Sequence, residues 1–315
     1  MRLVRHPHKL AAGPRGCVAT IGNFDGVHLG HQAVIRQLRT QADRLDLPAV
    51  VLTFEPQPQE YFAPERAPAR LTSFREKAEL LAACGVDVVC CLRFGESLAG
   101  QSPADFAERL LVRGLGVKSL VIGDDFRFGK GRTGDVDFLA EFGRHAGFDV
   151  LPTQTCLIEG ERVGSGRIRT ALAGGRFETA AELLGRPYSI RGRVVHGDKR
   201  GRVLGFPTAN IGLRRRRPPL HGIYAVTVRE LDDRSREGVA SVGTRPVFDG
   251  GEFVLETFLF DFDEDLYGRR VSVEFRTLLR PERDFPSVEA LQAQMHEDVE
   301  AARAYFKRQR VEAIG

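Results

Sequence analysis

The sequence predicts an α/β protein in two parts: an N-terminal, Rossmann-like doubly wound domain and a C-terminal antiparallel β-barrel with a closing helix. The chain has 315 residues, about twice the length of a typical single domain, so two domains are expected. Short apolar runs alternate with helix-like stretches in the first part, whereas strands follow one another without helices in the second. We therefore expect domains at residues 1–185 and 186–315.

The expected strands of the first domain are short apolar runs bounded by Gly, Asp or Pro, as is typical of buried parallel strands. They lie at residues 17–22, 50–54, 86–92, 120–123 and 148–151. One helix is expected from Gly30 to Leu45, with Ile35 and Leu38 on its apolar face, and another begins at Ser73. Residues 176–184 form the last helix of the domain, and residues 185–187 a short hinge.

The second domain is expected to be built from strands separated by turn residues. They lie at residues 188–195, 222–228, 239–242, 253–262 and 270–278, and a helix from residue 287 to about 308 closes the chain. Regular short strands of this kind are typical of an antiparallel sandwich or barrel.

Composition and charge exclude several classes of protein. The chain is 42% hydrophobic and 28% charged, which argues against disorder, and no segment approaches the roughly 20 apolar residues of a membrane span. The basic N-terminus lacks the apolar run of a signal peptide, so a cytoplasmic protein without a membrane partner is expected. The five cysteines show no metal-ligand spacing, so we interpret them as reduced, buried thiols.

The slight excess of basic residues does not predict nucleic-acid binding. The 46 Lys and Arg residues and the 42 Asp and Glu residues are spread almost evenly over the two domains. The only basic run is Arg214 to Arg217, which Pro218 and Pro219 follow and which no aromatic residue interrupts. We interpret this run as a solvated loop rather than a nucleic-acid site.

The sharpest local signal is GNFDGVHLGHQ at residues 22–32, which directly follows a predicted strand and opens a helix. The glycines allow the backbone to approach a ligand closely, and the N–H groups of a helix N-terminus suit phosphate. His28 and His31 are three residues apart, so they face the same way on a first helical turn. The pattern favours a nucleotide-phosphate site; a pair of capping histidines or a metal pair is the alternative.

Three other segments are expected at the carboxyl edge of the same sheet. They are EPQP at residues 55–58, DDFRFG at 124–129 and GSGRIR at 164–169. Phe126 and Phe128 could be core residues and Arg169 a surface cation, but together the segments could form a pocket for a planar ring and a triphosphate. The spacing around Gly123 and Lys130 fails the P-loop pattern, and GLG at 114–116 lacks the third glycine of a dinucleotide fingerprint.

These motifs, with TFEPQPQEYF at residues 53–62 and GDKRGRVLGFPTAN at 197–210, resemble those of bacterial bifunctional riboflavin kinase/FAD synthetases in the same order over nearly the whole chain. The resemblance implies that the second domain phosphorylates riboflavin to FMN and the first adenylylates FMN to FAD, releasing pyrophosphate. It implies riboflavin, FMN, FAD and ATP as ligands, and Mg²⁺ as the metal. Oligomerisation stays open.

For the first domain, the resemblance implies that His28, His31 and Arg169 act on the phosphates. It implies a flavin contact for Asp125, Phe126 and Arg127. The remaining implied contacts to ATP are Gly22, Asn23, Phe24, Asp25, Gly26, Ser165 and Arg167.

One departure from the family pattern bears on the first activity. The family has Ser-Ser-Thr where this chain has Gly164, Ser165 and Gly166, so one hydroxyl of three is kept. A lost hydrogen bond to a charged phosphate costs about 1.5–3 kcal/mol. We expect a working but weakened adenylyltransferase; a riboflavin kinase with an inactive first domain is the alternative.

For the second domain, the resemblance implies Glu256 as the general base for the ribityl hydroxyl. It implies Gly205, Thr208 and Asn210 at the ATP phosphates, and the oxygens of Thr208 and Asn210 as hard ligands of Mg²⁺. Arg280 is assigned to the flavin. A non-catalytic flavin- or nucleic-acid-binding regulator is the alternative from another class.

Overall fold

The computed structural model describes residues 1–5, 16–197, 205–213, 215, 217–229, 235–245 and 252–312. The chain forms two compact units. The first contains residues 1–68 and 74–165, and the second contains residues 69–73 and 166–315.

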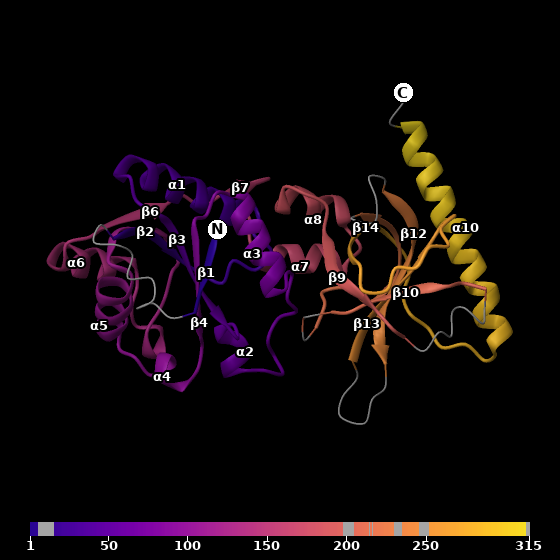
Figure 1. Ribbon diagram of the computed structural model, residues 1–315, viewed down its shortest axis with the longest axis horizontal. Helices are drawn as coiled ribbons and strands as arrows, with labels where there is room; N and C mark the ends of the chain where they lie inside the picture. The colour runs from indigo at the N-terminus through magenta and orange to yellow at the C-terminus, as the bar shows by residue number, and fades with distance from the viewer. Residues whose placement is uncertain are drawn as a thin grey trace. The chain divides into compact units, whose positions relative to one another are not determined.

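The first unit is built on a six-stranded parallel sheet (Figure 1). Its strand order is β1 (Arg2–Val4), β4 (Val88–Arg93), β3 (Ala49–Glu55), β2 (Cys17–Ile21), β5 (Val117–Gly123) and β6 (Asp149–Thr153). The chain moves outward from β2 through β3 to β4, then returns to β5 on the other side of β2. The doubly wound prediction is confirmed, and the switch in direction lies between β2 and β5, where such sheets bind ligands.

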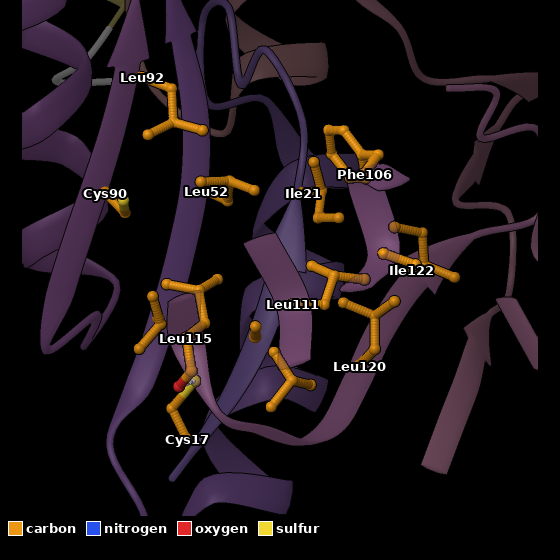
Figure 2. Close-up of a cluster of buried hydrophobic side chains, with 14 of the residues drawn as sticks. Cys17, Ile21, Leu52, Cys90, Leu92, Phe106, Leu111, Leu115, Leu120 and Ile122 are labelled. Atoms are coloured by element: carbon orange, nitrogen blue, oxygen red, sulfur yellow. Dashed lines mark hydrogen bonds between the residues drawn. The ribbon is translucent and has the colours of Figure 1, made fainter. Parts of the chain in front are cut away.

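Both faces of this sheet are covered because its strands are apolar on both sides. Val18, Val51 and Val121 pack against α1 (Leu29–Leu45) and α3 (Phe74–Ala83). The alternate residues Ile21, Leu52 and Leu120 pack on the other face, as Figure 2 shows. That face is covered by α5 (Pro103–Phe106), the π-helical segment η2 (Ala107–Leu115) and α6 (Val136–Ala146).

The predicted strands and the two helices are present with ends shifted by a few residues. Ile35 and Leu38 are buried in α1, as predicted. The sequence-based predictions did not include β1, the helical segments α5, η2 and α6, or the short elements α2 (Pro58–Phe62), α4 (Glu96–Ala99), η3 (Lys130–Arg132), β7 (Leu157–Ile158) and β8 (Glu161–Arg162). The short elements are single turns or minimal strands, too short for a periodic pattern.

The cysteines are free thiols, but they are not uniformly buried. Cys17, Cys90 and Cys91 are buried, whereas Cys84 and Cys156 are half-buried, which corrects the prediction for those two. Burial raises the pKa of Cys17 and of Cys90 to about 12, so both thiols stay protonated at neutral pH. Cys17, labelled in Figure 2, is the first residue of β2, and its Sγ donates to the Leu115 carbonyl at 3.3 Å.

The second unit contains a closed, six-stranded antiparallel barrel, as predicted. Its order is β10 (Thr208–Ile211), β13 (Glu252–Leu259), β12 (Arg236–Arg245), β11 (Gly222–Arg229), β14 (Arg270–Arg280) and β9 (Ser189–Val195). The closing helix is α10 (Val288–Glu312), which is the last element in Figure 1. Its Ala302 and Phe306 pack on Ala225 and Phe260. The sequence did not predict β10, because this short polar segment becomes a strand only by pairing with β9 and β13.

Two helices that precede the barrel in the chain belong to the second unit. They are α7 (Ser165–Ala173), from its second residue onward, and α8 (Phe177–Leu184). Phe177 packs its ring 5.7 Å from that of Tyr224 and 6.4 Å from that of Phe275 in the barrel. The expected boundary between residues 185 and 186 separates the residues assigned to the two activities, and it stays a prediction.

Candidate active sites

A cavity of about 860 Å³ opens in the first unit among the segments that follow β2, β3, β5 and β6. These segments leave the carboxyl ends of the strands around the switch point, so the cavity lies where the sequence motifs predict a ligand. Its charged lining residues are Asp25, Arg66, Asp124, Asp125, Arg127, Arg132 and Arg162. The arginines outnumber the aspartates, and His28, His31, Gly22 and Asn23 line the same space.

His28 caps helix α1, which the sequence allowed as an alternative to phosphate binding. Its Nδ1 accepts a hydrogen bond from the His31 backbone N–H at 3.3 Å. A nitrogen that accepts must lack a proton, so the proton of the neutral ring lies on Nε2. The two interpretations are compatible, because Nε2–H remains a donor while Nδ1 caps the helix.

The His31 ring stacks on the His28 ring, with centroids 3.6 Å apart and an interplanar angle of 18°. The same side of the first turn therefore carries both rings, as predicted. Burial lowers the pKa of His31 well below its ordinary value, and the neighbouring His28 and Lys77 lower it further. At neutral pH the His31 ring is therefore uncharged and offers an N–H donor rather than a charge.

The glycine-rich loop is needed for this packing. A Cβ on Gly30 would lie 3.1 Å from His28 Cε1 and 3.2 Å from the Val163 carbonyl oxygen, and a Cβ on Gly22 would lie 3.0 Å from the Phe24 ring. Gly26 has a φ of +84°, in the region that favours glycine.

The buried loop residue Asp25 connects two of the predicted motifs. Its carbonyl oxygen accepts a hydrogen bond from Ser165 Oγ at 2.9 Å. The one hydroxyl kept from the family pattern therefore holds the start of α7 against the GNFDG loop.

The predicted flavin residues line the cavity on the side of β5. Phe126 stacks on the buried Phe128 with centroids 5.5 Å apart, and both rings belong to the core and also line the cavity. Asp125 pairs with Arg162, whose Nη2 lies 2.8 Å from Asp125 Oδ1. Sequence reasoning missed Arg162, because a lone arginine in a short hairpin carries no signal of its partner.

An aromatic group forms a second part of the site that sequence reasoning missed. The Phe94 ring lies 5.6 Å from the ring of Tyr61 and 5.7 Å from those of Phe54 and Phe62, in edge-on contacts. Phe54, Phe62 and Phe94 line the cavity, and Phe62 is 66% exposed. The motif TFEPQPQEYF signalled a loop, but only the fold places Phe94 beside it.

The GSGRIR motif spans the division between the two units. Arg167 and Arg169 lie on the part of α7 that belongs to the second unit, where Arg169 Nε donates to the Ala69 carbonyl. Their predicted contacts with ATP stay predictions. Gly164 and Gly166 each have open space where a Cβ would lie, so packing does not require glycine at either position.

The predicted kinase residues of the barrel lie on one face of its wall. Strand register pairs Asn210 with Glu256, and directly paired antiparallel residues share a face; Thr208, two residues before Asn210, shares it too. The alternate residues Ile211 and Leu255 are buried in the barrel interior. Glu256 is half-buried and Asn210 is 8% exposed, so this face is largely covered.

The glycine-rich loop approaches this face at its start. A Cβ on Gly197 would lie 2.3 Å from Asn210 Nδ2, so glycine permits a close approach there. Gly205 is exposed with a φ of +85°. The intervening residues 198–204 lie outside the described residues.

Arg280 makes a bidentate ion pair with the buried Asp298 of α10. Its Nε and Nη2 lie 2.8 Å from Asp298 Oδ1 and Oδ2. The pair fastens the closing helix to β14, and the assignment of Arg280 to the flavin stays a prediction.

The solvated-loop interpretation of the arginine run is wrong for Arg215. This side chain is 8% exposed, and its Nη1 donates to the Leu71 carbonyl at 2.9 Å and contacts Tyr188 Oη at 3.1 Å. Carbonyl oxygens from residues distant in sequence solvate the guanidinium in place of water. Arg217 is exposed, and Arg214 and Arg216 lie outside the described residues.

Comparison with known proteins gives one consistent result. The FAD synthetase family matches residues 10–167 and the riboflavin kinase family residues 184–306. Two relatives named bifunctional riboflavin kinase/FMN adenylyltransferase come from Pseudomonas fluorescens and Escherichia coli K12. The first is 52% identical and covers 96% of this chain and 97% of its own. The second is 48% identical and covers 97% and 98%.

A solved structure also matches the whole chain. It is a Streptococcus pneumoniae protein named a macrolide-efflux protein, with a TM-score of 0.79, 32% sequence identity, and coverage of 96% of this chain and 98% of that one. Among the described helices, none is long and apolar enough to cross a membrane. With both family matches in the predicted order, the chain belongs to the family of bifunctional riboflavin kinase/FMN adenylyltransferases.

Proposed function

We propose that the cavity of the first unit binds ATP and FMN and joins FMN to the AMP part of ATP. The observation that carries this proposal is the stacked His28–His31 pair at the N-terminus of α1, inside a cavity at the switch point of the sheet. Helix N–H groups and the imidazole N–H donors suit the oxygens of a triphosphate. Gly22, Asn23, Phe24, Asp25 and Gly26 would shape the loop around it, and Ser165 would hold that loop in place.

Adenylyl transfer needs positioning more than proton transfer. The FMN phosphate is already ionised near pH 7, so it attacks the α-phosphorus without a general base, and pyrophosphate leaves. Neutral donors at His28 and His31 would stabilise charge on the transferring and leaving phosphates. Arg167 and Arg169 are proposed to add positive charge from α7.

The flavin would lie on the side of Asp125, Phe126 and Arg127. Planar rings favour stacked and edge-on aromatic contacts, and Phe62 and Phe94 offer such surfaces. Since Arg162 pairs with Asp125, flavin binding would have to share or displace this ion pair.

We propose that the barrel phosphorylates riboflavin at the face shared by Thr208, Asn210 and Glu256. Glu256 would accept the proton of the ribityl hydroxyl as its oxygen attacks the γ-phosphorus of ATP; the bond from that phosphorus to the β,γ-bridging oxygen breaks, and ADP leaves. Thr208 and Asn210 offer the hard oxygen ligands that suit Mg²⁺, which when bound neutralises phosphate charge. Gly205 would let the loop backbone approach the phosphates, and Arg280 would contact the flavin or hold α10 beside it.

Incubating the purified protein with riboflavin, ATP and Mg²⁺, followed by chromatography of the flavins, tests the proposal. FMN and FAD together are the expected products. FMN alone would mean an inactive first unit, which Gly164 and Gly166 motivate as the alternative, and unchanged riboflavin would exclude both activities. We also propose action in the cytoplasm, where ATP and riboflavin are available.

A further inference from the structure

The face of the barrel that carries Glu256 continues on the neighbouring strand β12. Strand register places Ser241 of β12 directly opposite Glu256, and Asn210 of β10 opposite Glu256 on its other side. Directly opposite residues of an antiparallel pair share a face, with Cβ atoms about 4.5–5.5 Å apart. The half-buried Ser241 therefore lies beside the proposed base, whereas the next residue, Val242, is buried in the barrel interior.

A second carboxylate lies on the same face, one step further along β12. Gly243 shares the face with Ser241, because residues two apart in a strand point the same way. A Cβ on Gly243 would overlap Oε1 of Glu282 and lie 2.6 Å from its Cδ, so the Glu282 carboxylate fills space that only glycine leaves. Gly243 and Glu256 are diagonal neighbours in the register, with Cα atoms about 7–8 Å apart.

His221 holds this carboxylate in place. Its Nε2 lies 3.0 Å from Glu282 Oε2, and its backbone N–H donates to Tyr224 Oη at 3.0 Å. Arg280, two residues before Glu282, pairs with Asp298 instead. An exposed ion pair contributes little to folding stability, so the main effect of the His221–Glu282 contact is to fix the position of the carboxylate.

The opposite end of this face is apolar. Val239 lies two residues before Ser241, and Phe258 two residues after Glu256; both pack in the cluster that α10 forms with the barrel. A flavin side chain that reaches Glu256 along β12 from the other end therefore passes the Glu282 carboxylate and the Ser241 hydroxyl.

We propose that Ser241 and Glu282 form a polyol subsite of the kinase site, which binds the inner hydroxyls of the ribityl chain and selects this chain over simpler ones. The inference rests on the proposed kinase function of the Glu256 face. Neighbouring carbons of the ribityl chain each carry a hydroxyl, so when the terminal hydroxyl meets the base, the inner ones need partners close by. A carboxylate accepts strong hydrogen bonds, and a serine hydroxyl both donates and accepts.

This subsite makes the barrel selective for a chain of hydroxyls. A site built to hydrogen-bond a substrate hydroxyl rejects an analogue that lacks it, because the polar groups of the site are then left unpaired. Ser241 and Glu282 contact parts of riboflavin that do not react. They therefore contribute to substrate binding, and their loss should raise KM while kcat changes little.

The test compares two substrates with and without the subsite. One is riboflavin, and the other is a flavin with a hydroxypentyl side chain, which keeps the terminal hydroxyl and lacks the inner ones. Glu282→Met removes the acceptor and should raise KM for riboflavin by about tenfold, with KM for the hydroxypentyl flavin unchanged. Ser241→Ala should raise KM for riboflavin by about fivefold, as for a neutral hydrogen bond, again without effect on the analogue.

Three further variants separate binding from packing. Glu282→Gln keeps an acceptor of the same shape and should lie between wild type and Glu282→Met. His221→Ala should raise KM for riboflavin in wild type but add nothing to Glu282→Met, because a positioning residue acts only through its partner. Glu264→Met removes an exposed carboxylate elsewhere in the same unit and should leave both KM values unchanged.

An equal rise in KM for both flavins overturns the inference, as does an unchanged KM for riboflavin in Glu282→Met and Ser241→Ala. Thermal unfolding, and FAD formation from supplied FMN at the wild-type rate, show that each variant is folded; if Glu282→Met is not, Ser241→Ala decides the question. The proposed function fails separately, if the wild-type chain phosphorylates neither flavin.

Discussion

The candidate phosphate sites of the two units differ in how their polar groups are assembled. In the first unit the histidine pair and its phosphate loop come from one continuous stretch, in which the loop after β2 leads into the first turn of α1. In the barrel, Asn210 and Glu256 come from separate strands that only the register of β10 on β13 brings face to face. The first arrangement depends on local backbone geometry, and the second depends on long-range pairing.

The proposed chemistry differs in the same direction. Adenylyl transfer to an ionised phosphate needs donors in fixed positions, which a loop and a helix end supply. Phosphorylation of a hydroxyl needs a base, so one carboxylate on a rigid wall is enough if ATP is aligned beside it. The rate of adenylyl transfer should therefore depend on the positions of several donors. The rate of phosphorylation should depend mainly on one carboxylate oxygen, that of the proposed base.

The largest effect is expected from Glu256→Gln, which removes the proposed base and keeps the shape of the side chain. Riboflavin phosphorylation should fall by about a thousandfold, within the range that general bases contribute. FAD formation from supplied FMN should remain at the wild-type rate, measured by chromatography of the flavins. Retained phosphorylation would show that Glu256 is not the base.

The opposite loss of activity is expected for His28→Ala, in which FAD formation falls and FMN formation persists. The substitution removes both the α1 cap and an N–H donor. FAD formation from FMN should fall by about a hundredfold, as for loss of one oxyanion donor, while FMN formation from riboflavin continues. His28→Asn is the matched control, because asparagine can cap the helix, so it separates the capping role from the donor role. Equal activity of all three proteins would contradict the assignment.

A gain of activity is expected from Gly166→Thr, which restores a hydroxyl of the family pattern. A Cβ at this position meets open space, so the substitution should be accepted without strain. FAD formation should rise by about tenfold, the lower end of what a hydrogen bond to a charged group contributes. Gly166→Ala adds the Cβ without the hydroxyl; if it gives the same rise, the hydroxyl explanation fails.

The smallest catalytic effect, with a clear effect on stability, is expected from Arg215→Ala. The variant removes the guanidinium donor shared by the Leu71 carbonyl and the Tyr188 hydroxyl, while the Tyr188 hydroxyl still donates to the Leu71 carbonyl, so the loss should cost about 1–2 kcal/mol of unfolding free energy. The melting transition should fall by several degrees while both activities at 25 °C persist. Arg217→Ala, at an exposed position of the same run, should leave the transition unchanged.

Much of the fold and part of the site follow from local patterns. The strand that ends before Gly22, the helix that starts near Gly30 and the histidine spacing between them are all legible in a short window. β10 and Arg162 could not be recognised in this way. β10 becomes a strand only by pairing with its neighbours, and Arg162 is a site residue only because it forms an ion pair with Asp125. The arginine run illustrates the same limit, because a cluster of charges gives no sign that carbonyl oxygens will surround one of them.

The sequence by itself determined the order of a doubly wound sheet and a barrel, the helix-opening histidine motif and the family to which the chain belongs. These follow from hydrophobic period, glycine placement and motif spacing, which act within a few residues. The tertiary structure alone decided the burial of Arg215, the packing of α8 against the barrel and the pairing of Arg162 with Asp125. Each of these joins residues far apart in the chain, and the energy of a buried charge depends on partners that no local pattern specifies.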